Sequence, residues 1–237
     1  MMTTKPKHCA YCGKDRSQGK FDMEHFAGKC LWAGPRPQMT RTVPVHVACN
    51  QAAKDDAEYL RDVLVMDESA GWHPEVQRLQ ATMHRKMKTH FSSIKKTLKG
   101  LKVRSVVTQS GLYVGEHPSF EIDWPRMRRA LWNVMRGIHY SVRSEPMPQD
   151  VDYKIMVAKQ SNVMAYKQVI DMMVPWQGFG DDVFACRYVF SPTQPGAMTC
   201  LMMFYKTRVF LGRSWPYHIV SATPQHLGED INVRELV

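Results

Sequence analysis

The clearest pattern in the chain is an amphipathic helix in its middle. After a Gly-Trp-His-Pro break at residues 71–74, apolar side chains recur every three or four positions, which is the spacing of one face of a helix. We expect this helix to run to about Lys99 and to stop at Gly100, a residue type that favours helix ends. Its apolar face consists of Val76, Leu79, Met83, Met87, Phe91, Ile94 and Leu98.

Two further helices are predicted on either side of it. From about Ala52 to Met66 the apolar positions again fall at helical spacing, and Asn50 is placed to cap the first turn. A second pattern runs from Pro125 to about Val142 and contains Gly137. A glycine inside a helix costs about 1 kcal/mol relative to alanine, so we expect close packing against a neighbour there. The buried stripe of this helix is Met127, Leu131, Met135 and Ile138.

The rest of the chain after residue 100 predicts an α+β domain with antiparallel strands, because short apolar runs alternate with turn residues. The strands are expected at Lys102–Thr108, Leu112–Val114, Ser119–Ile122, Tyr153–Ala158, Val183–Phe190, Met198–Tyr205 and Arg208–Leu211, with a helix over Asn162–Met173. A turn across Ser191–Gly196 would join two strands in a hairpin. We therefore divide the chain into an N-terminal module over 1–66, a linking helix over 67–100 and this domain over 101–237.

Residues 8–50 have the composition of a metal-stapled segment. They show little periodicity and are rich in Cys, His, Gly and Pro, so they bury too little apolar surface to fold unaided. Cys9 and Cys12 form a C-x2-C knuckle, and His46 and Cys49 supply an H-x2-C pair. Together they make a Cys3His set, which is typical of structural zinc.

The other three cysteines are interpreted as thiols. Cys30 is the alternative to His46 as fourth ligand, but it stands alone, and an unpaired cysteine is more often a small buried apolar residue. Cys186 and Cys200 fall in apolar strands and could face each other across the predicted hairpin. The N-terminus lacks the apolar run of a secretory signal, which favours a location in the cytoplasm of a bacterial or phage-infected cell. Because that compartment is reducing, we expect free thiols rather than disulfides.

Charge adds an expectation about partners. The formal net charge of +10 favours polyanions, nucleic acid first and an acidic membrane surface second. No apolar run reaches the roughly 18 residues of a transmembrane helix, and we expect no membrane partner. The polar face of the linking helix is either a track for phosphates, with Arg85, Lys88 and Lys95 as contacts, or a solvated surface. Its basic residues are Arg78, Arg85, Lys86, Lys88, Lys95, Lys96 and Lys99.

The acid–histidine pair Glu24-His25 lies between the two ligand pairs, and Asn50 directly follows the last ligand, with Lys54 four positions later. The order C-x2-C, then acid-His, then [C/H]-x2-C-[H/N]-x3-K resembles the HNH endonucleases, which have the ββα-metal fold. The resemblance covers about residues 8–66. It implies that the acid–histidine pair lies on the first strand of a hairpin and that Asn50 opens the helix that follows.

The resemblance also implies a role for each of these residues. His25 would be the general base that activates water, and histidine suits this role because its ordinary pKa lies near neutral pH. Glu24 and Asn50 would hold one catalytic divalent cation, Mg²⁺ or Mn²⁺, in addition to the structural zinc. Lys54 would contact a phosphate of the DNA backbone, and Arg41 is a further candidate nucleic-acid contact.

One position departs from the family pattern. The asparagine that orients the base would fall near Arg41 or Thr42, and neither is Asn. The leading hypothesis is an endonuclease that hydrolyses DNA, in a defence, mobile-element or phage context, with residues 101–237 selecting targets or contacting partner proteins. The alternatives are a nucleic-acid-binding or assembly protein that has the zinc-stapled fold without cleavage, and a zinc-dependent protein-interaction module.

Overall fold

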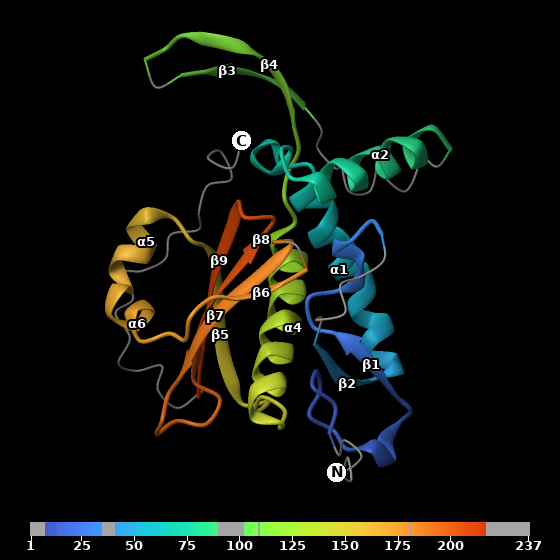
Figure 1. Cartoon of the computed structure of the whole chain (residues 1–237), viewed down its shortest axis with the longest axis vertical. Helices are drawn as coiled ribbons and strands as arrows, with labels where there is room; N and C mark the ends of the chain where they lie inside the picture. Colours follow the sequence, from blue (N-terminus) through green and yellow to red (C-terminus); the bar gives the residue numbers. More distant parts are fainter. Residues whose placement is uncertain (1–7, 35–40, 90–101, 109, 181, 217–237) are drawn as a thin grey trace.

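The computed structural model describes residues 8–34, 41–89, 102–108, 110–180 and 182–216. Its central element is α4 (Trp124–Arg143), which lies between a five-stranded sheet on one side and an N-terminal unit of two strands and a helix on the other (Figure 1). A separate hairpin projects from one end of the molecule. The chain is thus a mixed α/β protein with antiparallel sheets.

The N-terminal unit has the order strand, strand, helix. β1 (Phe21–His25) pairs antiparallel with β2 (Thr42–His46), and α1 (Val47–Val65) follows at once. Val43 and Val45 of β2 are fully buried, which fixes one face of the hairpin against the core. Hydrophobic periodicity alone predicted no strands in this segment. Three 3-10 turns lie in the connections of this half: η1 (Arg16–Gln18), η2 (Lys29–Leu31) and η3 (Glu68–Ala70).

The start of α1 corrects the sequence prediction. The helix begins at Val47 rather than near Ala52, and its N-cap is His46, so the prediction of Asn50 as the cap was wrong. Asn50 lies in the first turn, and its amide Nδ2 donates to Oε2 of Glu24 at 2.9 Å. The polar side chain at the helix start is therefore used for a contact with β1 instead of for capping.

The basic linking helix is confirmed as far as the structure describes it. α2 spans Pro74–Thr89, and the remainder of the predicted helix, with Lys95, lies outside the described residues. β3 (Lys102–Val107) and β4 (Tyr113–Ser119) then form the projecting hairpin. The strand predicted over 119–122 was wrong, because Ser119 is the last residue of β4 and the chain then passes to the N-cap of α4.

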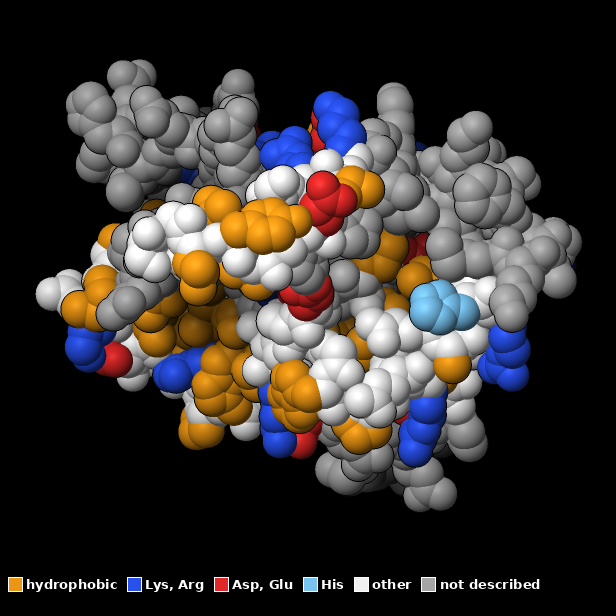
Figure 2. Space-filling model, turned by 90° about the horizontal axis from the view of Figure 1, so that it is seen from above, with side chains coloured by type: hydrophobic (Ala, Val, Ile, Leu, Met, Phe, Trp, Pro, Cys, Tyr) orange, Lys and Arg blue, Asp and Glu red, His pale blue; other side chains and the backbone are white. Residues whose placement is uncertain are grey.

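This hairpin is an unusually exposed part of the molecule. It forms a two-stranded sheet of its own. Large apolar side chains of this hairpin are exposed, and an exposed apolar surface often marks a contact surface. Seen from above, hydrophobic side chains are exposed alongside Lys and Arg side chains on this face (Figure 2). Five large hydrophobic residues in or beside its strands are more than half exposed: Val103, Val107, Leu112, Tyr113 and Val114.

The C-terminal sheet has the strand order β5-β9-β8-β7-β6 and is antiparallel throughout. Its strands are β5 (Val151–Val157), β6 (Gln177–Phe179), β7 (Phe184–Phe190), β8 (Met198–Phe204) and β9 (Arg208–Pro216). The hairpin predicted across Ser191–Gly196 is confirmed as β7–β8. The single helix predicted over 162–173 is instead two short ones, α5 (Gln160–Ala165) and α6 (Lys167–Asp171). β6 was missed because three residues are too few to show alternation.

Cys186 and Cys200 are both buried free thiols in the β7–β8 pair. The register places Tyr188 opposite Cys200, so the two cysteines are diagonal neighbours and not directly facing residues.

Close packing around α4 joins the two halves. A Cβ built on Gly137 would lie 2.1 Å from Cβ of Phe26, which confirms the tight contact expected at this glycine. Buried side chains of the ββα unit, α4 and the sheet belong to one hydrophobic cluster, while the domain borders stay a prediction. Within the described ranges, no helix combines the length and apolar character needed to cross a membrane.

An ionic contact also ties α1 to α4. Both carboxylate oxygens of Asp56 accept from arginines of α4, at 3.1 Å from Nε of Arg126 and 2.7 Å from Nε of Arg129. Burial by itself raises the pKa of Asp56, but the hydrogen bonds from the two arginines outweigh it and lower the pKa below its ordinary value. The folded state therefore favours the ionised carboxylate.

We expect Asp56→Asn to lower the free energy of unfolding by about 1–3 kcal/mol at neutral pH, because two charged hydrogen-bond donors lose their acceptor. A carboxylate with a lowered folded-state pKa contributes stability above its unfolded-state pKa of about 3.9. That contribution is lost as the pH falls through the folded-state value, so the difference between wild type and variant should shrink in urea unfolding series taken to acidic pH. Asp171→Asn is the control, because Asp171 forms an exposed ion pair with Lys167. Equal effects of the two variants would contradict the assignment.

Candidate functional site

The predicted zinc ligands come together at the base of the ββα unit. The ligand atoms of Cys9, Cys12, His46 and Cys49 all lie within 4.8 Å of one another. The knuckle that carries the first two is tied to β2, because the backbone N–H of Ala10 donates to the carbonyl of Pro44 at 2.8 Å. The last two come from the end of β2 and the first turn of α1.

The ring of His46 is oriented as a metal ligand requires. Its Nε2 donates to the carbonyl oxygen of Asp15 at 3.1 Å, and its Nδ1 lies 3.3 Å from Sγ of Cys12. A hydrogen bond from one ring nitrogen to a carbonyl fixes the tautomer and leaves the other nitrogen to bind metal. Three thiols and one imidazole so arranged could hold a structural metal such as zinc.

The thiols of this cluster influence one another. Burial raises the pKa of Cys9, but backbone N–H groups directed at its sulfur, among them that of His46, lower it below its ordinary value. Burial and the neighbouring thiols raise the pKa of Cys49 to about 12. One thiolate therefore forms readily, and its negative charge opposes the ionisation of a second thiol. A bound cation removes this repulsion.

Arg136 of α4 supplies a positive charge beside the cluster. Its guanidinium stacks over Trp132 with 5.0 Å from Cζ to the ring centroid. Burial lowers the pKa of Arg136, while the charges of Tyr153 and of the cluster thiols Cys12, Cys9 and Cys49 raise it. No group in the described part of the chain accepts a hydrogen bond from its buried Nε. A zinc ion with three thiolates keeps one net negative charge, which this cation would balance.

We expect Arg136→Gln to weaken zinc binding by about tenfold, because groups outside the ligand shell typically contribute 10- to 100-fold to metal affinity. Competition with a chromophoric chelator measures the change. Arg143→Gln is the matched control, since Arg143 is also on α4 and stacks on an aromatic ring, Phe190 of strand β7. Unchanged zinc affinity in Arg136→Gln would remove this role from Arg136.

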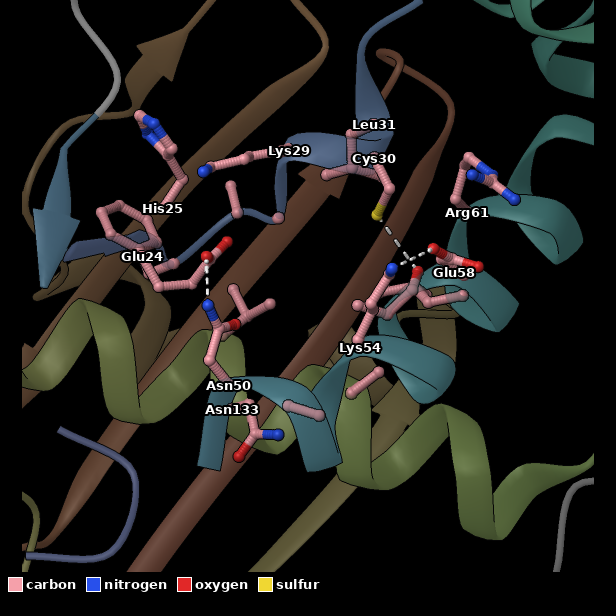
Figure 3. Close-up of a pocket in the computed structure, with 18 of the residues that line it drawn as sticks. Glu24, His25, Lys29, Cys30, Leu31, Asn50, Lys54, Glu58, Arg61 and Asn133 are labelled. Atoms are coloured by element: carbon pink, nitrogen blue, oxygen red, sulfur yellow. Dashed lines mark hydrogen bonds and ion pairs between the residues drawn. The ribbon is translucent and has the colours of Figure 1, made fainter. Parts of the chain in front are cut away.

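The second group of predicted residues meets at the other end of the hairpin. Glu24 and His25 are the last two residues of β1, and Asn50 reaches Glu24 from the first turn of α1. Figure 3 shows the side chains of Glu24 and Asn50 pointing toward one another, while the ring of His25 points away from the pair. Opposite directions are expected for successive residues of a strand. All three nevertheless line the same cavity.

That cavity has a volume of about 470 Å³. Its walls come from the end of β1, from η2 and from the length of α1, and part of its lining comes from α4. It is lined by Tyr11, Glu24, His25, Phe26, Ala27, Gly28, Lys29, Cys30, Leu31, Asn50, Gln51, Ala53, Lys54, Ala57, Glu58, Leu60, Arg61, Ala130, Asn133 and Val134.

The predicted nucleic-acid contacts are spread over the surface. Lys54 lines the cavity, 3.9 Å from Glu58. Arg41 is exposed just before β2. Burial raises the pKa of Cys186 to about 12, and the positive charge of Arg41 opposes this rise. Arg85 is exposed on α2. The side chain of Lys88 and the whole of Lys95 lie outside the described residues.

Two residues, Arg41 and Thr42, lie near the position where the sequence pattern led us to expect a base-orienting asparagine. Thr42 is the residue paired directly with His25 across the β1–β2 hairpin. The cavity also contains residues that the sequence did not single out, namely Lys29, Arg61 and Asn133. No motif marks them, because they follow no ligand spacing and Asn133 belongs to a helix far along the chain.

Cys30, the alternative fourth ligand, lies in this cavity and not in the metal cluster. Its thiol donates to the carbonyl of Ala57 at 3.4 Å, and burial raises its pKa to about 11.

Comparison with known proteins finds no matching protein-family model, no matching curated protein and no matching solved structure. The function is therefore inferred from the residues of the two clusters and from their arrangement.

Proposed function

We propose that this chain is a metal-dependent endonuclease of the HNH type that hydrolyses phosphodiester bonds of DNA. The observation that carries the proposal is the contact between Glu24 and Asn50 at 2.9 Å, in one cavity with His25. Glu24 and His25 come from β1 and Asn50 comes from α1, two elements of a ββα unit whose base is a Cys3His cluster. The combination supports a catalytic site held by a structural metal.

The residues present fit a hard divalent cation. A carboxylate and an amide provide the oxygen ligands that Mg²⁺ and Mn²⁺ prefer, and Mg²⁺ is often bound by only one or two protein groups with water in the remaining positions. Such a cation supplies positive charge to the phosphate and to the leaving oxygen. In this proposal Glu24 and Asn50 hold the cation, and His25 takes the proton from the attacking water.

The charge distribution supports a nucleic acid as substrate. Between residues 74 and 104 there are nine Lys and Arg residues against one Glu, so this stretch carries +8 of the net +10. The exposed residues Lys102 and Arg104 continue it onto the β3–β4 hairpin. Because contacts with phosphates release counterions, binding to DNA should weaken steeply as salt rises.

The deciding experiment incubates purified, zinc-loaded protein with supercoiled plasmid and with single-stranded circular DNA, in Mg²⁺, in Mn²⁺ and without a divalent cation. We expect nicked or linear products only with Mg²⁺ or Mn²⁺, and much less product from Glu24→Gln. Intact plasmid and intact single-stranded DNA in both Mg²⁺ and Mn²⁺ would exclude the enzyme.

The second candidate is a nucleic-acid-binding protein that has lost cleavage. It is favoured by the absence of the base-orienting asparagine that the HNH pattern has near Arg41 or Thr42, the second of which pairs directly with His25. In that case the protein would still shift DNA in a gel in a salt-dependent way, and the cleavage assay would stay negative.

A further inference from the structure

The cavity beside Glu24 extends well beyond the predicted catalytic residues. Its lining follows α1 from Asn50 to Arg61, which at 1.5 Å per residue is a length of about 16 Å. Its volume of about 470 Å³ lies in the range of cavities that hold one small molecule. A cavity of this size can take one nucleotide, whereas a base inside a duplex reaches such a pocket only after it leaves the stack.

Small apolar residues leave the cavity open along α1 and α4. Ala53 and Ala57 of α1 and Ala130 and Val134 of α4 all line it. Larger side chains of α1, among them Leu60, also contribute to the lining. The flat face of a nucleobase is apolar and can lie against such a surface. This contact does not depend on which base is bound. The amide of Asn133, also part of the lining, can donate to and accept from the edge of a base.

The opening of the cavity carries two lysines. Lys29 of η2 and Lys54 of α1 lie on opposite sides of it (Figure 3). Lys54 forms a loose ion pair, 3.9 Å from Glu58, with both side chains well exposed. Exposed pairs of this kind contribute little to stability, so Lys54 can exchange its partner for a phosphate at small cost. Each lysine can therefore contact a phosphate of a strand bound in the cavity that also contains Glu24 and Asn50.

We propose that this cavity binds one unpaired nucleotide next to the bond that is cut. The base lies against the alanines of α1, and phosphates of the strand contact Lys29 and Lys54. The inference rests on the proposed nuclease function and narrows its substrate to strands with an unpaired nucleotide: single-stranded DNA, bulges and frayed ends. A fully paired duplex can reach the site only by extruding a base.

The test measures binding without cleavage. A single-stranded oligonucleotide containing 2-aminopurine, a fluorescent base, is titrated with zinc-loaded protein in about 0.15 M salt without Mg²⁺ or Mn²⁺. We expect the fluorescence to change on binding, and the same strand annealed to its complement to bind at least about tenfold more weakly with little change in signal. An RNA strand of the same sequence shows whether the 2′-hydroxyl is tolerated. Equal affinity for strand and duplex, or no binding of the strand, would overturn the proposal.

Two matched pairs of variants locate the binding in the cavity. Ala53→Leu fills the cavity, whereas Ala52→Leu places the same side chain on an exposed position of α1 that does not line it. Lys29→Met removes an exposed charge at the opening, and Lys20→Met removes one outside it. We expect the first member of each pair to weaken strand binding by about five- to tenfold, and the second by less than about twofold. Urea unfolding checks that each variant is folded. If Ala53→Leu does not fold, the pair Lys29→Met and Lys20→Met decides whether the strand binds in the cavity.

The outcomes also separate this inference from the proposed function. Cleavage of duplex plasmid that needs Mg²⁺ and His25, with no preference for unpaired strands, would keep the nuclease and reject the nucleotide pocket. Selective binding of the strand without any cleavage would keep the pocket and reject the enzyme.

Discussion

Replacing His25 by alanine should lower the rate of DNA cleavage by about 10²- to 10⁴-fold, which is the usual contribution of a general acid or base. The variant loses the group proposed to take the proton from water, while Glu24 and Asn50 keep their contact. DNA affinity in a gel shift should therefore stay within about twofold of wild type, because most of the binding charge lies elsewhere on the chain. The measurement is the single-turnover conversion of DNA at saturating Mg²⁺.

His84→Ala is the matched control for this prediction. His84 is exposed on α2 and does not line the cavity, so its loss should leave the rate unchanged. A His25→Ala protein that cleaves at more than about half the wild-type rate would remove His25 from the chemistry. A parallel loss of rate and of DNA affinity would point to a role in binding.

Replacing Cys12 by serine should have the largest effect on stability. Zinc bound by a Cys3His set contributes its binding free energy to folding, and small zinc units commonly unfold without the metal. We expect zinc content to fall from about one ion per chain to near zero. We also expect the free energy of unfolding to fall by an amount on the order of 4–5 kcal/mol, the upper range for single substitutions. Metal analysis and urea unfolding measure the two effects, and chelation of the wild type should reproduce the second.

Cys30→Ser is the control for this variant. Cys30 lies outside the cluster, and a serine there can still donate to the carbonyl of Ala57. It should keep one zinc per chain and lose little stability. Loss of zinc in Cys30→Ser with retention in His46→Ala would reverse the choice of the fourth ligand.

The accuracy of the sequence predictions follows from how local each signal is. The helix over Trp124–Arg143 was predicted to within one residue at each end, because its apolar stripe and the proline at its start, Pro125, are contained in the helix itself. The hairpin β7–β8 was predicted for the same reason. The start of α1 was misplaced, because Asn50 has the chemistry of a cap and its contact with Glu24 depends on a strand distant in sequence.

The sequence by itself determined the candidate metal set. Ligand type and short spacing are local properties, so the pairs Cys9–Cys12 and His46–Cys49 could be recognised before any fold was known. Only the tertiary structure decided that Cys30 lies in the cavity, that Thr42 stands opposite His25, and that α4 brings Arg136 to the thiols. These contacts join residues far apart in the chain. They arise because α4 packs between the sheet and the ββα unit, and no periodicity or spacing encodes which side chains such packing brings together.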